Sequence, residues 1–392
     1  EGLRLPPVRL AVNGEMLRDI EAIIFANVRT PEERRGDLRA QMAACRRATI
    51  RMGELATRYG AATLTRIMDE VLDYSERLMR DALSRLPDGE GRFEDVCDGD
   101  GILEPGETED RTFTIRMHVV KSGDRLRVDF TGTDPAVAGP INAPLTVTAS
   151  GVFCALKMIA DPNSLIPPNS GCWRPVEVVA EPGSVVHAQS PSPVVYANHE
   201  MSHRIADMMF GACVAFAPNN VMACSQGTSA VLTLGGTDPR NGERYVSYET
   251  IKGGFGARPG KDGINAVAST ISNTMNTPIE VLEMSFPVRV EEYSILPDSG
   301  GAGRWRGGCG VRRVWRVLDH DSRAAICCER TVSAPFGLVG GSAGSPARLT
   351  VEHPDGSSRR PLSKGAFTAP AGSRVIFDVP GSGGYGPRAE RD

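Results

Sequence analysis

The stretch from Asn198 to Arg204 gathers more reactive side chains than any other short segment of this sequence. Within it, residues 199–203 match the pattern H-E-x-x-H. On a helix, two imidazoles four residues apart can bind zinc while the glutamate activates a water molecule. A zinc peptidase needs a further ligand, but Ala206 and Met209 stand where the extended motif has glycine and histidine. We therefore predict no metal site in this chain and treat the match as coincidental.

A wider set of polar side chains stands at the ends of apolar segments, several beside glycine or proline. Carboxamides and an arginine in such places can hold a small polar substrate and its developing oxyanion. The alternative that Asn and Gln merely cap loops stays open. We predict that Glu200 acts as a base or orients a ligand, and that Arg204 clamps a carboxylate or phosphate. The predicted catalytic residues are Asn198, Glu200 and Arg204, and the predicted substrate-binding residues include Asn142, Gln226, Asn273 and Asn276.

Two helices are expected before these residues. Thr30 can cap the first helix, Pro31 suits its first position, Glu33 completes a capping box, and Gly60 ends it. Apolar residues at helical spacing continue to a stop at residues 87–89. The sequence thus predicts a helical hairpin for residues 1–90.

A mixed α/β domain is expected for residues 91–285. Alternating apolar residues on both sides of residues 122–124 predict a β-hairpin. Helices are predicted at 146–159 and 204–212, and strands near 176–179, 231–234 and 245–248. After residue 285, short β-type runs between Gly- and Pro-rich turns predict a β-rich module, a barrel or a sandwich, for residues 286–392. The fold class is therefore mixed α/β.

Composition narrows the possible partners. The chain has 392 residues, 44 Lys+Arg against 48 Asp+Glu, and a net charge of -4. This balance favours neither nucleic acid nor a membrane surface, and no apolar run approaches the ~20 residues of a membrane span. The nine cysteines contain no C-x-x-C pair, which favours reduced, mostly buried thiols and a cytoplasmic protein. The chain starts at Glu1 without methionine, and we expect a further segment upstream or on another chain.

Glycine-rich stretches at 300–303, 307–310 and 381–384 fit no phosphate-binding motif, so we expect no ATP site in this chain. Several motifs in order do carry a resemblance to a known family. They read NVRTP (27–31), GDLRAQ (36–41), DFTGT (129–133), GPINAP (139–144), PPNSGC (167–172), NTMNTP (273–278), PDSGGAG (297–303) and PGSGGYG (380–386). Together they resemble the hydantoinase B / 5-oxoprolinase family, whose N-methylhydantoinase B-type subunits they match from Glu1 to Pro387. Arg29, inside the first motif, joins the predicted substrate-binding residues.

The resemblance implies a subunit of a hetero-oligomer that opens a cyclic amide, such as a hydantoin or the 5-oxoproline of glutathione metabolism. A hydantoinase A-type partner would bind ATP with Mg²⁺ and activate the ring carbonyl, and this chain would complete the cleavage with water. It also implies a divalent metal held by residues upstream of Glu1. Related acetone and acetophenone carboxylases leave a carboxylase subunit open, as well as a non-catalytic assembly subunit. At His199 and His203 the family pattern has an apolar residue and Gln instead.

Overall fold

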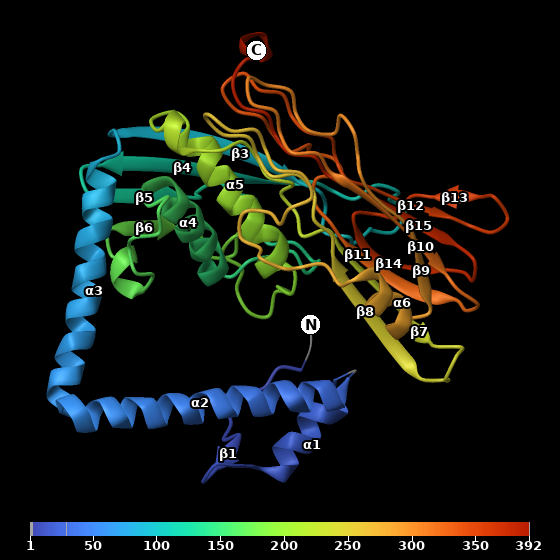
Figure 1. The fold of residues 1–392 in the computed structure, drawn as a ribbon, viewed down its shortest axis with the longest axis horizontal. Coiled ribbons are helices and arrows are strands. Elements are labelled where there is room, and N and C mark those ends of the chain that lie inside the picture. Colours follow the sequence, from blue (N-terminus) through green and yellow to red (C-terminus); the bar gives the residue numbers. More distant parts are fainter. Residues whose placement is uncertain (1–2, 29, 392) are drawn as a thin grey trace. The chain divides into compact units, whose positions relative to one another are not determined.

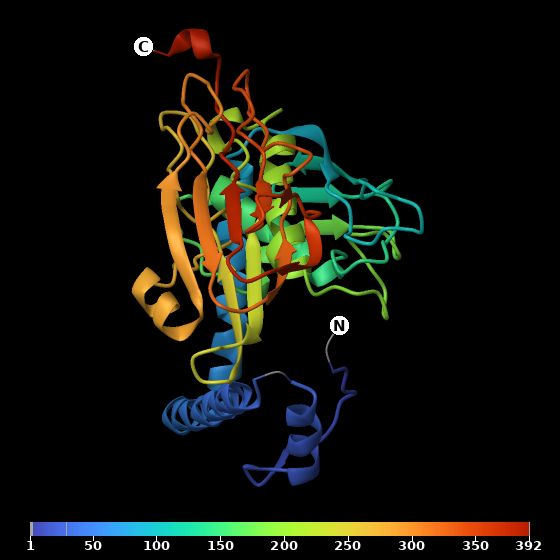
Figure 2. The same cartoon turned by 90° about the vertical axis from the view of Figure 1, so that its right-hand side faces the viewer.

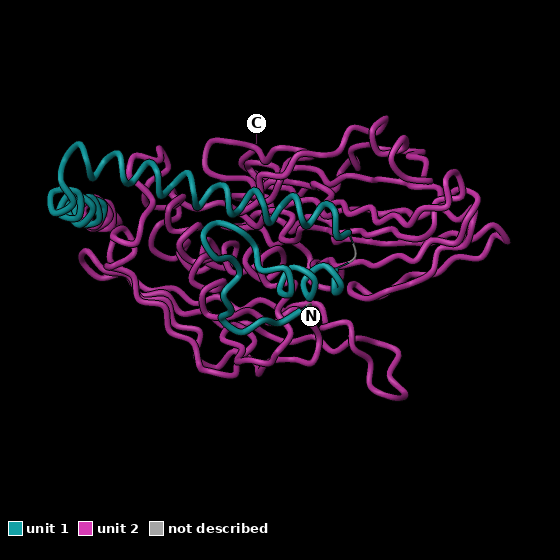
Figure 3. The backbone as a smooth tube through the Cα atoms, turned by 90° about the horizontal axis from the view of Figure 1, so that it is seen from below, with its two compact units in different colours: residues 1–75 teal, residues 76–392 magenta. Residues whose placement is uncertain are grey.

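The computed structural model of the protein describes residues 3–28 and 30–391. By their contacts, the chain divides into two compact units between Ser75 and Glu76 (Figure 3). The predicted boundaries at residues 90 and 285 are not tested by this division and stay predictions. Within the described residues, no helix combines the length and the apolar character needed to cross a bilayer.

The described helices and strands are, in chain order, β1 (Ala11–Val12), β2 (Glu15–Met16), α1 (Arg18–Ala26), α2 (Pro31–Tyr59), α3 (Ala61–Ser84), β3 (Gly89–Cys97), β4 (Phe113–Ser122), β5 (Arg125–Asp129), α4 (Leu145–Ala160), β6 (Val176–Val179), α5 (Ser202–Cys213), β7 (Val231–Thr237), β8 (Arg244–Thr250), α6 (Ile279–Ser285), β9 (Val288–Ile295), β10 (Val311–Val317), β11 (Ser322–Cys327), β12 (Arg348–Glu352), β13 (Ser358–Arg359), β14 (Lys364–Ala369) and β15 (Arg374–Val379). Short 3₁₀ turns occupy Ser170–Trp173, Pro218–Asn220 and Arg388–Glu390, and a π-helical turn at Ala197–Met201 leads directly into α5.

The two predicted N-terminal helices are confirmed as α2 and α3, which are separated by Gly60. Gly60 has a φ of +81°, which ends α2, and Figure 1 shows α2 and the first part of α3 leaving it in different directions. The helices do not pack as a hairpin, because predicted apolar-face residues such as Leu55 and Tyr59 are 40% and 46% exposed. The capping box is also corrected, since the Thr30 side chain makes no capping hydrogen bond.

A four-stranded sheet in the order β3-β4-β5-β6 forms the first layer of the second unit. The predicted hairpin at residues 122–124 is confirmed as β4–β5, with Ser122 paired to Arg125. Helix α5 packs on β3 and β4, and α4 packs beside α5 (Figure 1). The helix approaches very closely at Gly91 in β3, where an added Cβ would lie 1.9 Å from the Ala212 carbonyl oxygen. Every residue of α5 is buried, so its polar side chains need partners inside the protein.

A β-sandwich forms the second layer. Its sheets have the orders β13-β12-β15-β10-β9 and β14-β11-β7-β8, and their inner faces share one apolar core that includes Trp315, Ile326 and Phe377. Neither strand order closes on itself, so the sandwich alternative holds and the barrel does not. Figure 2 shows the yellow β7–β8 hairpin behind the orange and red strands of the five-stranded sheet. Because β7 pairs with β11, the β-rich part reaches back before residue 286.

The cysteines follow the sequence expectation. Seven of the nine are buried, whereas Cys154 is half-buried and Cys45 is exposed. Burial raises the pKa of the Cys327 thiol well above its ordinary value, and the neighbouring Glu200 carboxylate raises it further. The prediction of mostly buried thiols is thereby confirmed.

Candidate functional site

A cavity of about 400 Å³ in the second unit brings together three of the predicted site residues, Asn198, Asn273 and Asn276. It lies between the π-helical turn, the start of α5, the end of β8 and the loop that follows residue 270. The residues lining it are Asn198, His199, His203, Ser229, Tyr248, Glu249, Thr250, Ile271, Ser272, Asn273, Thr274, Met275, Asn276 and Thr277. Carboxamides, hydroxyls and imidazoles therefore face one small space, which suits a small polar molecule.

The acidic group on the cavity wall is Glu249, near the end of β8. Burial raises the pKa of its carboxyl group, and the Arg313 guanidinium, 3.1 Å away, opposes that rise. On another wall, Asn276 donates a hydrogen bond to the Tyr293 hydroxyl, which orients its carboxamide. A carboxyl group with a raised pKa on the wall of such a cavity can exchange a proton with a bound substrate.

His203 is buried, and both of its ring nitrogens are engaged. The Ser229 hydroxyl gives its proton to the His199 carbonyl at 2.7 Å, so it can only accept from His203 Nε2–H at 3.3 Å. The other nitrogen, Nδ1, then accepts from the Ser269 hydroxyl at 2.7 Å. Burial, with the nearby Lys252 and His199, lowers the pKa of His203 to about 3. His203 is therefore a neutral, hydrogen-bonded imidazole, and the H-E-x-x-H pair does not converge on an ion.

Glu200 lies behind the cavity wall and is fully buried. Its carboxylate accepts hydrogen bonds from the Thr228 hydroxyl at 2.7 Å and from the Ser229 amide at 3.1 Å. His199 Nδ1 lies 3.3 Å from the same carboxylate. Among the described residues, donor atoms of His199, Glu200 and Cys327 lie within 4.8 Å of one another, close enough for a metal ion. Glu200 itself does not line the cavity but contacts His199, which does, and its predicted role stays a prediction.

Arg204 does not face the cavity, although its predicted role requires that it does. It is fully buried, donates to the Val96 carbonyl at 3.0 Å, and pairs with Asp95 at 2.9 Å and with Glu329. Arg330 also pairs with Asp95, and Lys364 pairs with Glu329. Burial alone would raise the pKa of Asp95, but Arg204 and Arg330 outweigh it and hold that pKa below its usual value. The sequence shows the charge of Arg204 but not these internal carboxylates, which satisfy it.

Asn142 and Gln226 are placed inside the protein and bind backbone groups. Asn142 accepts from the Val137 amide at 2.8 Å and donates to the carbonyls of Val137, Gly139 and Pro193. Gln226 donates to the carbonyls of Thr228 and Ile251 and accepts from the Gly253 amide. For these two residues the loop-capping alternative matches the structure. Arg29 lies outside the described residues.

Lys252 is a residue at this site that the sequence prediction missed. Its side chain is buried, and Nζ donates to the Thr250 hydroxyl at 2.9 Å and to the Ser272 hydroxyl at 3.4 Å, both on cavity-lining residues. In the described part of the chain, no carboxylate forms an ion pair with it. Burial lowers the pKa of Lys252, and Glu200 opposes this effect. The sequence feature that could have indicated Lys252 is a single lysine between the apolar Ile251 and the Gly253–Gly254 pair.

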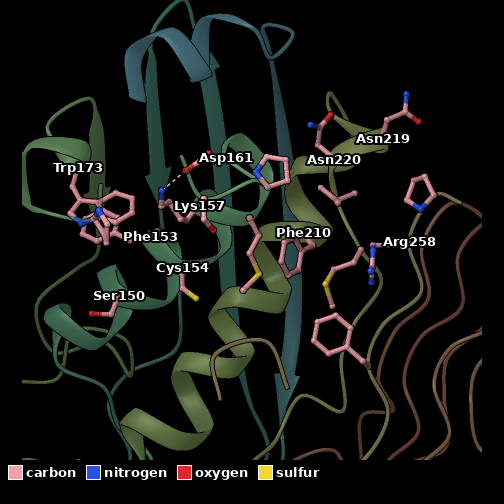
Figure 4. Close-up of a pocket in the computed structure, with 18 residues that line it drawn as sticks. Ser150, Phe153, Cys154, Lys157, Asp161, Trp173, Phe210, Asn219, Asn220 and Arg258 are labelled. Atoms are coloured by element: carbon pink, nitrogen blue, oxygen red, sulfur yellow. Dashed lines mark hydrogen bonds and ion pairs between the residues drawn. The ribbon is translucent and has the colours of Figure 1, made fainter. Parts of the chain in front are cut away.

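A second cavity, of about 790 Å³, lies between α4, α5 and the loops near residues 162 and 258. Figure 4 shows Phe153 stacked against Trp173, with ring centroids 4.4 Å apart, and the Lys157–Asp161 ion pair on its wall. This cavity is larger and more apolar, but none of the predicted site residues lines it. Because its lysine and aspartate neutralise each other, we place the candidate site in the smaller, more polar cavity.

Known proteins resemble this chain in sequence and in fold. A family model described as Hydantoinase B/oxoprolinase matches residues 1–388. A putative D-/L-hydantoinase B-type subunit of Pseudomonas sp. (strain NS671) is 32% identical over the whole chain, which covers 66% of that protein. The crystal structure of ATP-dependent caprolactamase from Pseudomonas jessenii has a TM-score of 0.84 and 31% identity, with 100% of this chain and 68% of that chain covered. A nucleotide-free acetone carboxylase structure, with a TM-score of 0.88, 18% identity and coverage of 98% and 57%, shares the fold. The chain thus spans about two thirds of the length of its first curated relatives.

Proposed function

Because this chain belongs to the hydantoinase B/oxoprolinase family, we propose that it forms the larger part of a B-type subunit that hydrolyses a cyclic amide. It acts in a hetero-oligomer with a hydantoinase A-type subunit, in the cytoplasm. The observation that carries the proposal is the family match over residues 1–388, which includes every residue of the polar cavity. The names of the relatives, a hydantoinase B-type subunit and an ATP-dependent caprolactamase, support the same substrate class.

Close backbone packing accounts for the glycine-rich segments of this chain without a bound nucleotide. A Cβ at Gly301 would lie 2.1 Å from the Ser342 carbonyl oxygen, and one at Gly307 would lie 2.1 Å from that of Ser382. Neighbouring backbone packs against the Cα atoms of these glycines, which explains why they carry no side chain. We therefore assign ATP and Mg²⁺ to the A-type subunit, where ATP would activate the ring carbonyl.

The cavity of this chain would bind the ring and help water to open it. Asn198, Asn273 and Asn276 present carboxamides that can pair with the N–H and C=O of a cyclic amide. Glu249, with its raised pKa, can take a proton from the attacking water and return it to the leaving nitrogen. The buried cation Lys252 lies one hydrogen bond behind the wall and favours negative charge on the carbonyl oxygen.

The test uses the natural protein that carries this chain, combined with a hydantoinase A-type subunit. ADP release is measured with hydantoin, 5-oxoproline or caprolactam, and separately with a ketone plus bicarbonate. We expect cyclic-amide-dependent release that Asn273→Ala lowers, while Asn219→Ala, on the wall of the other cavity, leaves it unchanged. Release only with ketone and bicarbonate would show a carboxylase subunit. If no substrate stimulates ADP release, the assembly role stands.

A further inference from the structure

The geometry points to a metal-binding site formed by His199, Glu200 and Cys327, and we propose that it takes a divalent transition ion of the zinc type. One nitrogen, one oxygen and one sulfur from these residues lie within 4.8 Å of one another. Donors around a tetrahedral zinc ion are roughly 3.3–3.8 Å apart, given bonds of about 2.0–2.3 Å. A donor pair at the full 4.8 Å would therefore have to close by about 1–1.5 Å when the ion binds.

The surroundings of these donors resemble a built site. Glu200 and Cys327 are 0% and 1% exposed, so a bound ion would be shielded from water on their side. The Thr228 hydroxyl and the Ser229 amide already hold the two oxygens of Glu200, as second-layer hydrogen bonds hold ligating carboxylates. The His199 ring is held against the Tyr196 ring, with centroids 5.4 Å apart.

The donor chemistry selects the ion. Imidazole and thiolate favour zinc and its transition-metal neighbours over magnesium or calcium, which prefer all-oxygen sites. A carboxylate and a thiolate together balance the two positive charges, so the filled site would be neutral in the protein interior. His199 also lines the polar cavity, whereas Glu200 and Cys327 lie behind its wall. Three protein ligands leave one position of a tetrahedral zinc ion, which a water molecule would fill.

From the sequence we predicted that neither His199 nor His203 binds a metal ion. The present inference changes that prediction for His199 and keeps it for His203. The H-E-x-x-H pattern would use His203 as the second imidazole, yet both nitrogens of that ring are bound to serine hydroxyls. The third donor comes instead from Cys327, at the end of β11. A metal here does not depend on the cyclic-amide proposal, because it rests on the positions of the three donors alone.

Cobalt titration of the full chain tests the site. Co²⁺ bound to a thiolate gives a ligand-to-metal charge-transfer absorption, which a site with only oxygen and nitrogen ligands lacks. We expect one such Co²⁺ per chain, displaced by Zn²⁺. Cys327→Ser should abolish the band, and His199→Val should weaken binding by about 100-fold or more, since even second-layer changes cost 10–100-fold. The matched controls Cys328→Ser and His203→Gln should keep the band, because neither side chain belongs to the donor set.

A sulfur-specific measurement covers the case in which Cys327→Ser fails to fold. X-ray absorption at the zinc edge of the unaltered chain should show one sulfur neighbour. A band that survives in folded Cys327→Ser, a zinc spectrum without sulfur, or no band in the unaltered chain overturns the proposal. None of these readouts uses turnover, so they are separate from the outcome of the ADP assay.

Discussion

Replacing Arg204 by Met should destabilise the protein, although the sequence alone predicted loss of turnover without unfolding. The side chains of Asp95, Asp98 and Glu329 oppose those of Arg204, Arg330 and Lys364 in one buried cluster, and their formal charges cancel. Each of these residues is at most 7% exposed. Arg204→Met would leave one uncompensated negative charge on the Asp95–Glu329 side. Removing one partner of a buried ion pair costs about 3–5 kcal/mol, and we expect the same loss here.

Urea unfolding followed by circular dichroism measures this loss, and a fall of roughly 1 M in the midpoint is expected. Arg204→Lys, which keeps the charge, should lose less than Arg204→Met. In the double variant Arg204→Met with Glu329→Gln the charges cancel again, so the second change should cost less than it does in the unaltered protein. If Arg204→Met unfolds at the original urea midpoint but loses turnover in the complex, the buried cluster does not stabilise the fold. The prediction that Arg204 binds a substrate carboxylate or phosphate would then hold.

Buried groups and close contacts give three other predictions. His203 stays neutral when folded, with a pKa of about 3, but gains a proton below about pH 6.5 when unfolded. The free energy of unfolding should therefore fall as the pH drops below 6.5, by about 2 kcal/mol at pH 5. Urea denaturation at pH 6.5 and at pH 5 measures this fall, and His203→Gln should lack the part of it that comes from His203. An equal pH dependence in both proteins would contradict the neutral imidazole. Lys252→Met should lower cyclic-amide-dependent ADP release by less than the roughly 100-fold that loss of a direct oxyanion donor costs, because Lys252 acts through Thr250 and Ser272. The urea midpoint should stay level or rise, because a buried lysine without an ion pair is removed. Unchanged release would take Lys252 out of the site. Gly91→Ala should cost about 1–3 kcal/mol by thermal unfolding, since its Cβ meets the Ala212 carbonyl, whereas Gly53→Ala in α2, with nothing within 4 Å, should cost nothing. Equal stability of these two variants would show that β3 and α5 are not so closely packed.

Local sequence patterns correctly predicted those helices and strands whose own residue preferences match the way they pack in the fold. The β4–β5 hairpin has strict alternation and a turn at residues 122–124, and α4 has apolar residues at helical spacing. Strand β3 was missed, because its two glycines and charged residues are poor strand formers and pairing with β4 stabilises it. The α2–α3 hairpin was overpredicted, since apolar spacing shows which face a helix offers but not whether anything covers it.

The site was harder to predict than the fold. Side chains of the same type can either be hydrogen-bonded inside the protein or face the cavity, and the sequence does not show which. Asn142 and Asn273 are the same residue type beside similar apolar segments, yet one is bonded to four backbone groups and the other faces a cavity. Arg204 could not be separated from a substrate clamp without the positions of Asp95 and Glu329. Lys252 follows the end of β8, and Cys327 is the last residue of β11. No spacing rule joins either residue to His199.

The pairing of β7 with β11 has a consequence for synthesis of the chain on the ribosome. Strands β7 and β8 emerge early, and β11 follows after roughly 4–15 s at about 5–20 residues per second. During that time the edge of β7 lacks its neighbouring strand β11, Leu232 and Leu234 lack their core, and the free edge can pair with another chain. We expect nascent chains arrested before residue 322 to be cut by protease within residues 231–250, and longer chains to resist. Chaperone binding during this interval would limit aggregation, so the rate of translation between β8 and β11 should affect the yield of folded protein.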